Sequence, residues 1–395
     1  MLSKQASVIL IKVLTGGLQY VVFKAIIHWE CENVEGKVGA DGKVIMQEFR
    51  KSYFLSLVSF FAMLLLIVPY FFKEIRDYYT SRKQSGLVAS YPYSTRAHLL
   101  TIFPGLLEVT GVVLSFFANQ SLNATTMLLL KSLRIPISAF MTKVLVGRSQ
   151  KAYQWLAVAI TLMALVPIGL AESAEKKKSS DSPIDVMTMV SLGLIVLSEI
   201  TKGVRYVYEE KLIKLEKMST EFVVFMESVV GLIVCIFIVI AVNFIPGTDG
   251  KPVEDAYETW VFLKNSVPLQ VMLVLNIFLC GIHHYTTTLI TEYLSSVHSV
   301  LISQLRPIVT FVVCVLIHYT SGHKSGEEIT PWTSLKVFGF ALSILAALLY
   351  NGNVRAPCDS CYPIEDSKAA EMAELDARSR STSEGGDIKK DDIAV

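Results

Sequence analysis

The sequence predicts an all-α polytopic membrane protein with about ten transmembrane helices in two inverted five-helix repeats. Three observations predict this class. The 395 residues are 52% hydrophobic and only 18% charged, with a mean hydropathy of +0.49, which is unusual for a soluble domain of this size. About ten apolar stretches reach the roughly 20 residues that a helix needs to cross a bilayer. Arginine and proline recur together inside two of these stretches, at Arg134-Ile135-Pro136 and Arg306-Pro307.

The expected spans lie near 6–27, 52–72, 98–119, 122–147, 152–171, 186–208, 220–244, 268–290, 294–318 and 333–352. The first is a retained span and not a removed signal peptide, because only Lys4 precedes it and no small-residue cleavage site follows. Long loops are expected over 28–51, 73–97 and 245–267.

A polar segment at 172–185 divides the spans into two sets of five. This division predicts a first five-helix repeat over 1–171, a linker over 172–185, a second repeat over 186–354 and a disordered tail over 355–395. Because five is odd, a second copy of the unit begins on the opposite side of the membrane. The halves are then inverted repeats with a shared site near the bilayer midplane.

The repeat is supported by one aligned stretch. An offset of 172 residues places Arg134 on Arg306 and keeps three leucine pairs in register: Leu122 with Leu294, Leu129 with Leu301, and Leu133 with Leu305. A guanidinium inside a hydrophobic span costs at least a few kcal/mol to insert. Its recurrence indicates a duplicated protein with a polar path, and a function in moving a solute. The Lys and Arg residues of the loops are nearly balanced between the two sides, so they leave the orientation open.

Arg134 and Arg306 are the leading candidates for binding substrate, because the guanidinium fork contacts phosphate or carboxylate through two hydrogen bonds. The alternative is that each pairs with an internal carboxylate and fixes two helices together. Lys131 lies three residues before Arg134, on the same helical face, where it extends the positive patch or reaches toward the interface. Pro136 and Pro307 are expected helix breaks, which line a cavity or merely kink the chain.

Three glutamates lie inside expected spans: Glu108, Glu199 and Glu227. They balance the arginines or take up protons during transport, and static balancing is the more frequent role. Lys202 follows Glu199 by three residues and precedes Arg205 by three, so this strip is a ladder of pairs within one helix or a polar face toward the cavity.

Two further polar positions are candidates. Gln19 follows Gly16-Gly17 in the first span, where glycines permit close helix approach. His283-His284 lies in the eighth span, and adjacent helical residues point about 100° apart, which makes them poor joint metal ligands. We expect His283 to act as a hydrogen-bonding group or pH sensor in the cavity.

The sequence has no GxSxG, Walker A or HExxH motif, so we expect no enzyme, no bound cofactor or metal, and energy from exchange or a gradient. A net charge of +1 gives no reason to expect nucleic acid. The expected partners are a small-molecule substrate and the lipid bilayer, with a homodimer left open. The six cysteines do not form a disulfide pattern, and Cys358 and Cys361 are a palmitoylated or an inert pair.

Several motifs carry a family resemblance. They are Lys131-Ser132-Leu133-Arg134, Leu145-Val146-Gly147-Arg148, Gln154-Trp155-Leu156-Ala157, Glu209-Glu210-Lys211, Glu227, Gln304-Leu305-Arg306 and Leu348-Leu349-Tyr350-Asn351-Gly352. With them the chain resembles the drug/metabolite transporter superfamily, and within it the nucleotide-sugar-transporter-like solute carrier family 35, in the branch of subfamily F, member six. Proven sugar-nucleotide carriers commonly have a Lys-based signature in span 4 and a Lys in span 9, where this chain has Lys131 with Arg134, and Arg306.

The resemblance implies ten spans, cytosolic termini, a central cavity lined by spans 4 and 9, and alternating access, often as an antiporter. It also implies a Golgi, ER or lysosome-like endomembrane, with the plasma membrane remaining open. The leading hypothesis is exchange of an anionic metabolite such as a nucleotide sugar. One alternative is a proton-coupled carrier of an organic cation, amino acid or drug-like solute, and another is a non-transporting membrane scaffold acting through its tail.

Overall fold

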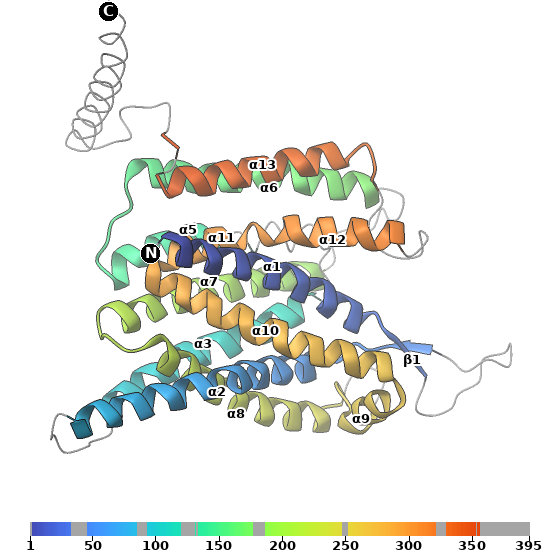
Figure 1. The fold of residues 1–395 in the computed structure, drawn as a ribbon. Helices are drawn as coiled ribbons and strands as arrows, with labels where there is room; N and C mark the ends of the chain where they lie inside the picture. The colour runs from blue at the N-terminus through green and yellow to red at the C-terminus, as the bar shows by residue number, and fades with distance from the viewer. Residues whose placement is uncertain are drawn as a thin grey trace, which may run out of the picture.

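The computed structural model describes residues 2–32, 46–84, 93–119, 131, 133–176, 186–246, 252–320, 329–352 and 354–355, and most of them are helical (Figure 1). Within these residues, eight segments are long and apolar enough to cross a membrane as helices. The predicted class, an all-α polytopic membrane protein, is therefore confirmed.

The helices before the expected linker are α1 (Leu2–Ile27), α2 (Ser52–Gln84), α3 (Thr95–Asn119), α5 (Arg134–Leu145) and α6 (Ala152–Lys176). Those after it are α7 (Val186–Lys214), α8 (Thr220–Phe244), α9 (Ala256–Asn265), α10 (Val267–Tyr293), α11 (Ser296–Ser303), α12 (Arg306–Thr320) and α13 (Thr333–Tyr350). Two short strands, β1 (Glu30–Glu32) and β2 (Met46–Glu48), pair antiparallel with Cys31 opposite Gln47.

The structure differs from four expected segments. Helices extend beyond the apolar runs because hydropathy marks where the membrane ends and not where helical hydrogen bonding ends, and two of the expected loops contain short elements of their own. The expected loop at 73–97 is largely helical, since α2 continues to Gln84 and α3 begins at Thr95. The loop at 245–267 contains α9, and the loop at 28–51 contains β1 and β2. The sixth span continues past 208 to Lys214 and buries Glu209 and Glu210 completely.

The helices pack in a pattern that crosses between the two halves (Figure 1). α1 lies against α10 and α12, while α7 lies against α3 and α5. α2 packs on α8 and α10, and α3 also packs on α8. α6 and α13 run along each other at one side of the bundle, and α5 contacts α11. One apolar core joins α5, α6, α11 and α13 around Ile135, Ala157, Val297 and Leu349.

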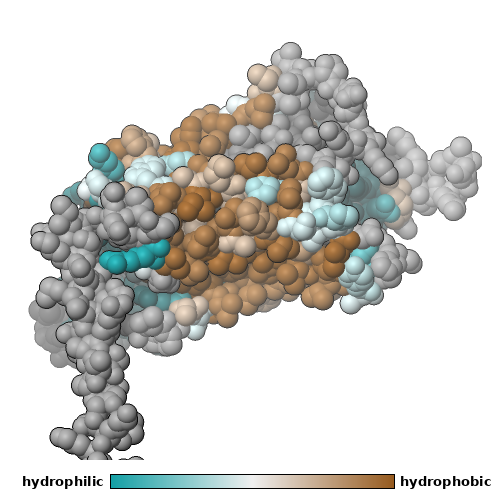
Figure 2. All heavy atoms as spheres, turned by 90° about the horizontal axis from the view of Figure 1, so that it is seen from above, coloured by the Kyte–Doolittle hydropathy of each residue, from teal (hydrophilic) through white to brown (hydrophobic). Residues whose placement is uncertain are grey.

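The outer surface of the bundle is strongly apolar. Figure 2 shows hydrophobic side chains over the middle of the face and more hydrophilic ones toward its two ends. Large apolar side chains such as Leu99, Phe237 and Phe278 are more than half exposed. A band of this extent would aggregate in water, so its solvent is lipid.

Among the described residues, Cys31, Cys235 and Cys280 form no disulfide. Cys358 and Cys361, together with the expected tail and most of the expected linker, lie outside the described residues.

Candidate functional site

Arg134 and Arg306 occupy equivalent places in two helices. Arg134 is the first residue of α5 and Arg306 is the first residue of α12. The helix before α12 ends at Ser303, so Gln304 and Leu305 interrupt it. Pro136 and Pro307 therefore lie in the first turn of a helix, where a missing backbone N–H breaks no hydrogen bond. The interruption at Gln304 and Leu305 comes directly before Arg306 and Pro307, while most of the chain before α5 lies outside the described residues.

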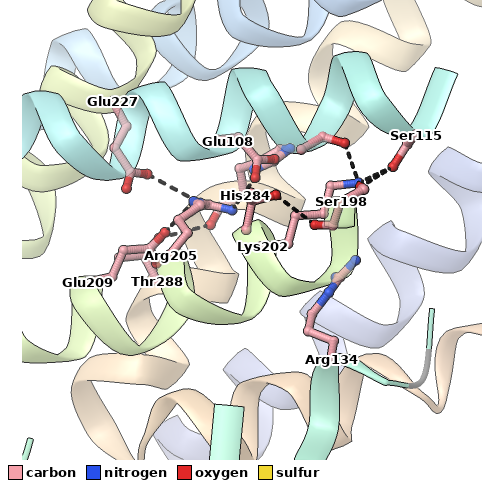
Figure 3. Close-up of polar contacts among 12 residues, drawn as sticks. Glu108, Ser115, Arg134, Ser198, Lys202, Arg205, Glu209, Glu227, His284 and Thr288 are labelled. Carbon is pink, nitrogen blue, oxygen red and sulfur yellow. Dashed lines mark hydrogen bonds and ion pairs between the residues drawn. The ribbon is translucent and has the colours of Figure 1, made fainter. Parts of the chain in front are cut away.

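Arg134 is held by Glu199 of α7. Its Nη2 lies 2.6 Å from Glu199 Oε2, and its Nε donates to the same oxygen at 2.8 Å. Glu199 is 0% exposed. Lys202 lies on the other side of this carboxylate, with Nζ 3.9 Å from Glu199 Oε1, and donates to Ser115 Oγ at 2.5 Å (Figure 3). The charge of Arg134 is thus compensated inside the bundle.

Arg306 has different partners. Its Nε donates to the Ser303 carbonyl at 3.1 Å, and its Nη1 lies 3.0 Å from His283 Nε2. No carboxylate approaches its guanidinium within 4.0 Å in the described part of the chain. Since an arginine can only donate, His283 Nε2 accepts here, which leaves its Nδ1 to donate to the Lys12 carbonyl, 3.3 Å away. Contact with Arg306 thus selects one neutral tautomer of His283.

Lys12 is a second buried cation in this region. Its Nζ donates to the Ser299 carbonyl at 2.6 Å and to Ser299 Oγ at 2.7 Å, and the residue is 0% exposed. Among the described residues no carboxylate lies within 4.0 Å of it. The junction of α1, α10, α11 and α12 therefore holds two basic side chains, Lys12 and Arg306, and His283 contacts the backbone carbonyl of the first and the guanidinium of the second.

Arg205 of α7 gathers three glutamates, one at each guanidinium nitrogen (Figure 3). Nη1 lies 2.9 Å from Glu108 Oε2 on α3, Nη2 lies 3.2 Å from Glu227 Oε2 on α8, and Nε lies 2.6 Å from Glu209 Oε1 on α7 itself. These four residues form the Arg205 cluster. Two of the expected internal acids thus balance Arg205, which is not one of the two arginines that the sequence singled out.

A cavity of about 230 Å³ lies between α1, α2, α3, α10 and α12. Its polar wall includes Gln19, Glu108, His284 and Arg306. On α1 the wall runs from Gly16 in mid-helix to Phe23, one turn before the helix ends. On α2 it begins at Ser56, one turn after that helix starts. The cavity therefore extends from the middle of the bundle toward the end where the α1–α2 connection lies.

The opposite end of the bundle, nearer the two termini, is tied by polar contacts between helices. Glu74 accepts hydrogen bonds from Tyr93 at 2.5 Å and from Ser219 at 2.9 Å, linking α2 to the start of α8. Glu210 pairs with Arg148 at 3.3 Å and with Lys214 at 3.2 Å, and also accepts from Ser296 at the start of α11. These contacts join helices from both halves of the chain.

The structure separates the candidate residues into three groups. Gln19, Glu108 and Arg306 line the cavity, and His283 contacts Arg306 directly. Arg134, Glu199, Lys202 and Glu227 lie in buried ion pairs. Lys131 is half-buried and has no ion pair within 4.0 Å in the described chain.

Sequence reasoning did not select His284, Lys12, Arg205 or Glu209 as site residues. The four-residue spacing of Arg205 and Glu209 was the available signal for that pair. Among the described residues, no group of three or more His, Cys, Asp or Glu side chains could hold a metal ion. The His283 and His284 rings lie 5.9 Å apart at an angle of 69°.

The sequence is similar to a family of membrane transporters and to several of its members. The model of the family described as nucleotide-sugar transporter matches residues 45–246. Human solute carrier family 35 member F6 is 24% identical over 259 residues, covering 64% of this chain and 67% of that protein. The Pongo abelii protein of the same name is 23% identical over 278 residues, covering 69% of this chain and 71% of that protein.

Two further similarities concern either a smaller part of the chain or its fold alone. The Caenorhabditis elegans UDP-N-acetylglucosamine/UDP-N-acetylgalactosamine transporter nstp-4 is 28% identical over 128 residues, covering 32% of this chain and 38% of that protein. A solved crystal structure covers 89% of this chain and 98% of its own, with 14% identity and a TM-score of 0.56. At that identity the likeness concerns the fold alone.

Proposed function

Because the chain belongs to the nucleotide-sugar transporter family, we propose that it is a secondary-active transporter that works by alternating access and exchanges an anionic metabolite such as a nucleotide sugar. The family is one of membrane transporters and not of enzymes. The name of the C. elegans relative gives two nucleotide sugars as that protein's substrates, and both are anionic because they carry a pyrophosphate.

The observation that carries this proposal is the position of Arg306. Its guanidinium lies on the cavity wall, is held by a carbonyl and a neutral imidazole, and has no carboxylate within 4.0 Å among the described residues. An uncompensated guanidinium in a low-dielectric site attracts an anion strongly. Lys12, whose backbone carbonyl contacts His283 and whose Nζ donates to the Ser299 carbonyl, adds a second basic side chain in this region. Gln19 and His284 supply neutral hydrogen-bonding groups on the same wall.

The cavity of about 230 Å³ is smaller than the roughly 300–1,000 Å³ of typical sites for drug-sized ligands. A nucleotide sugar therefore requires the cavity to widen. Alternating access provides such a movement, because one set of helices rocks against the other around a central site. The contrast between the two ends supports this mechanism, since the cavity reaches toward the α1–α2 connection while Glu74 and Glu210 tie the other end together.

We count ten spans: the eight helices that are long and apolar enough to cross a membrane, and two further segments. α7 is long enough at 29 residues but carries the charges of the Arg205 cluster and Glu199, which lower its apolarity. The other segment is 122–147, whose second part is α5. With these two, both termini lie on one side of the membrane, which we assign to the cytosol of an endomembrane such as the Golgi.

Inverted repeats are supported by the packing. If each helix of the first five is matched with one of the second five, α1 corresponds to α7, α2 to α8, α3 to α10, α5 to α12 with α11, and α6 to α13. The contacts of α1 with α10 and α12 then match those of α7 with α3 and α5, and that of α2 with α10 matches that of α8 with α3. The proposed units are 1–171 and 186–354, with a linker at 172–185 and a tail at 355–395.

A second candidate is a cationic or zwitterionic solute, such as an organic cation or amino acid. The observation that favours it is Glu108, which lies on the same cavity wall as Arg306. Because Glu108 is already paired with Arg205 at 2.9 Å, a substrate cation would have to compete with that arginine. The uncompensated Arg306 faces no such competition, and the anion is therefore the leading proposal.

A thermal-shift panel on the purified protein in detergent distinguishes these solutes. The panel holds nucleotide sugars, nucleoside monophosphates, amino acids and organic cations. A ligand that binds only the folded state adds about 2.7 kcal/mol at a hundred times its dissociation constant. We expect one nucleotide sugar and its matching monophosphate to raise the melting temperature. Shifts with amino acids or organic cations alone would overturn the anion proposal.

A further inference from the structure

The Arg205 cluster contains more carboxylate than cation. Three glutamates from α3, α7 and α8 meet one guanidinium at 2.6–3.2 Å. If all three were ionised, the cluster would carry a net charge of −2 inside the bundle, where Glu209 is 0% and Glu227 is 1% exposed. Uncompensated charge is far more costly to bury in such surroundings than in water.

No neighbouring cation removes this excess. The basic groups facing the cluster from its surroundings are the four residues Lys202 of α7, His284 of α10, Arg134 of α5 and Lys12 of α1. Tyr206 of α7 also faces it, with its ring centroid 5.1 Å from Arg205 Cζ. Arg134 and Lys202 are engaged by Glu199, and Lys12 by Ser299. Within the described chain none of the four lies within 4.0 Å of a carboxylate oxygen of Glu209 or Glu227.

The orphaned oxygens of the cluster point to a missing proton. The contact between Arg205 Nε and Glu209 lies off the N–H direction, so neither oxygen of Glu209 has a hydrogen-bond partner among the described residues. Glu227 Oε1 likewise has no hydrogen-bond partner among the described residues. A protonated carboxyl is neutral and gains an O–H donor, so one bound proton lowers the net charge of the cluster from −2 to −1 and gives an orphaned oxygen a hydrogen-bond partner. Carboxylates that share a buried site characteristically retain a proton between them.

We propose that Glu209 and Glu227 form a proton-binding site, in which one proton is shared between the two carboxyl groups. Arg205 then offsets one of the two negative charges that remain, on Glu108 and on the Glu209–Glu227 pair. The proton comes from water and forms an O–H bond to a carboxylate oxygen. The ligand of this site is a proton and not a metal, as the described residues contain no cluster of metal-ligating side chains.

The place of the site gives it a route to the cavity. Glu209 lies five residues before the end of α7 and Glu227 seven residues after the start of α8, which is about 8–11 Å from those helix ends at 1.5 Å per residue. Glu108 belongs to the Arg205 cluster and also lines the cavity. The proton site therefore lies between the cavity and the end of the bundle that carries the termini.

A coupling to transport follows, and this step rests on the proposed function. A solute that draws Glu108 away from Arg205 frees the guanidinium for Glu209 and Glu227, which favours release of their shared proton. A solute that binds Arg306 without disturbing Glu108 leaves the proton in place.

Infrared spectroscopy tests the site itself, on full-length protein in lipid and with no solute present. A protonated carboxyl gives a C=O stretching band that shifts in deuterium oxide. We expect this band at neutral pH in the wild type and its loss in both Glu209→Gln and Glu227→Gln. Glu210→Gln is the matched control: Glu210 is the next residue and is also fully buried, but it has two cations, Arg148 and Lys214. It should be ionised, so this variant should keep the band.

Melting temperatures give a second readout. Glutamine resembles a protonated carboxyl, so Glu209→Gln should melt within a few degrees of the wild type, while Glu210→Gln should melt lower because it loses two ion pairs. The proposal is overturned if the band is absent from the wild type, if it survives in both cluster variants, or if added sodium raises the melting temperature of the wild type but not of Glu209→Gln. None of these outcomes depends on whether the protein transports a nucleotide sugar.

Discussion

Arg306 Nη1 lies 3.0 Å from His283 Nε2, and this contact separates the two arginines that the sequence treats as equivalent. Arg134 meets the carboxylate of Glu199 at 2.6 Å. Arg306 meets an imidazole, which carries no compensating charge in the tautomer that the contact selects. One arginine is therefore a static ion-pair partner, and the other keeps an uncompensated charge at the cavity wall.

This difference predicts stability losses of unequal size. Arg134→Ala leaves Glu199 buried, and breaking a buried pair in this way costs about 3–5 kcal/mol. Because Lys202 Nζ remains 3.9 Å from Glu199, we expect the lower end of that range. Arg306→Ala removes no ion pair and should cost less than about 1 kcal/mol. Thermal unfolding of both variants in the same detergent checks the ranking, and equal losses would contradict it.

A close helix approach predicts a second effect. A Cβ at Gly281 of α10 would lie 2.8 Å from the Ala62 carbonyl oxygen of α2, which is backbone and cannot turn aside. Gly281→Ala should therefore separate these helices and cost about 1–3 kcal/mol. The control is Gly193→Ala, where nothing lies within 4 Å of the added Cβ and helix propensity predicts a gain of about 0.5–1 kcal/mol. A Gly281→Ala melting temperature at or above that of Gly193→Ala would refute the packing.

Gly16 gives a way to move Arg306 without removing its charge. A Cβ there would lie 2.3 Å from Arg306 Cδ and 2.8 Å from two atoms of His283. Gly16→Ala should push the guanidinium out of position and weaken binding of the ligand found in the thermal-shift panel by about tenfold, or 1.4 kcal/mol. Titration of the melting temperature with ligand measures this. Unchanged affinity in a folded Gly16→Ala protein would show that the position of Arg306 is immaterial.

Cys31 tests the small sheet outside the spans. Burial raises the pKa of the Cys31 thiol to about 11, and the residue is 4% exposed between β2 and the surrounding aromatic side chains. The thiolate is the reactive form, so maleimide labelling of the native protein at pH 8 should spare Cys31 and should rise only as the pH approaches 11. Peptide mass spectrometry, with unfolded protein as the positive control, provides the measurement. Rapid native labelling at pH 8 would place Cys31 in solvent.

Much of the fold could be predicted because a bilayer imposes a simple length and composition rule. The seventh expected helix, 220–244, matches α8 residue for residue, since its apolar run is broken by few polar residues. α7 was cut short at 208 because Glu209, Glu210 and Lys211 end the apolar run, although the helix continues to Lys214. Glu210 is buried against partners that are distant in the sequence, Arg148 after α5 and Ser296 at the start of α11, and a hydropathy profile does not contain such contacts.

The candidate site was also predicted only in part from the sequence. A charged residue inside an apolar run is visible in the sequence, and so Arg134, Arg306, Glu108, Glu199 and Glu227 were selected. Their pairing was not visible, because Arg134 and Glu199 are 65 residues apart and Arg205 and Glu108 are 97 apart. Tertiary packing alone decides which arginine is left without a carboxylate.

The most direct test of the central claim is exchange in proteoliposomes. The vesicles are preloaded with unlabelled uridine monophosphate, and entry of labelled UDP-N-acetylglucosamine is measured for the wild type, Arg306→Ala and the Gly193→Ala control. If the thermal-shift panel selects a different nucleotide sugar and its monophosphate, those two compounds are used instead. The account predicts exchange by the wild type and Gly193→Ala, and loss of at least about tenfold in Arg306→Ala, as removal of a charge-assisted contact implies. Exchange by folded Arg306→Ala at the wild-type rate would contradict the assignment of Arg306 to the substrate anion.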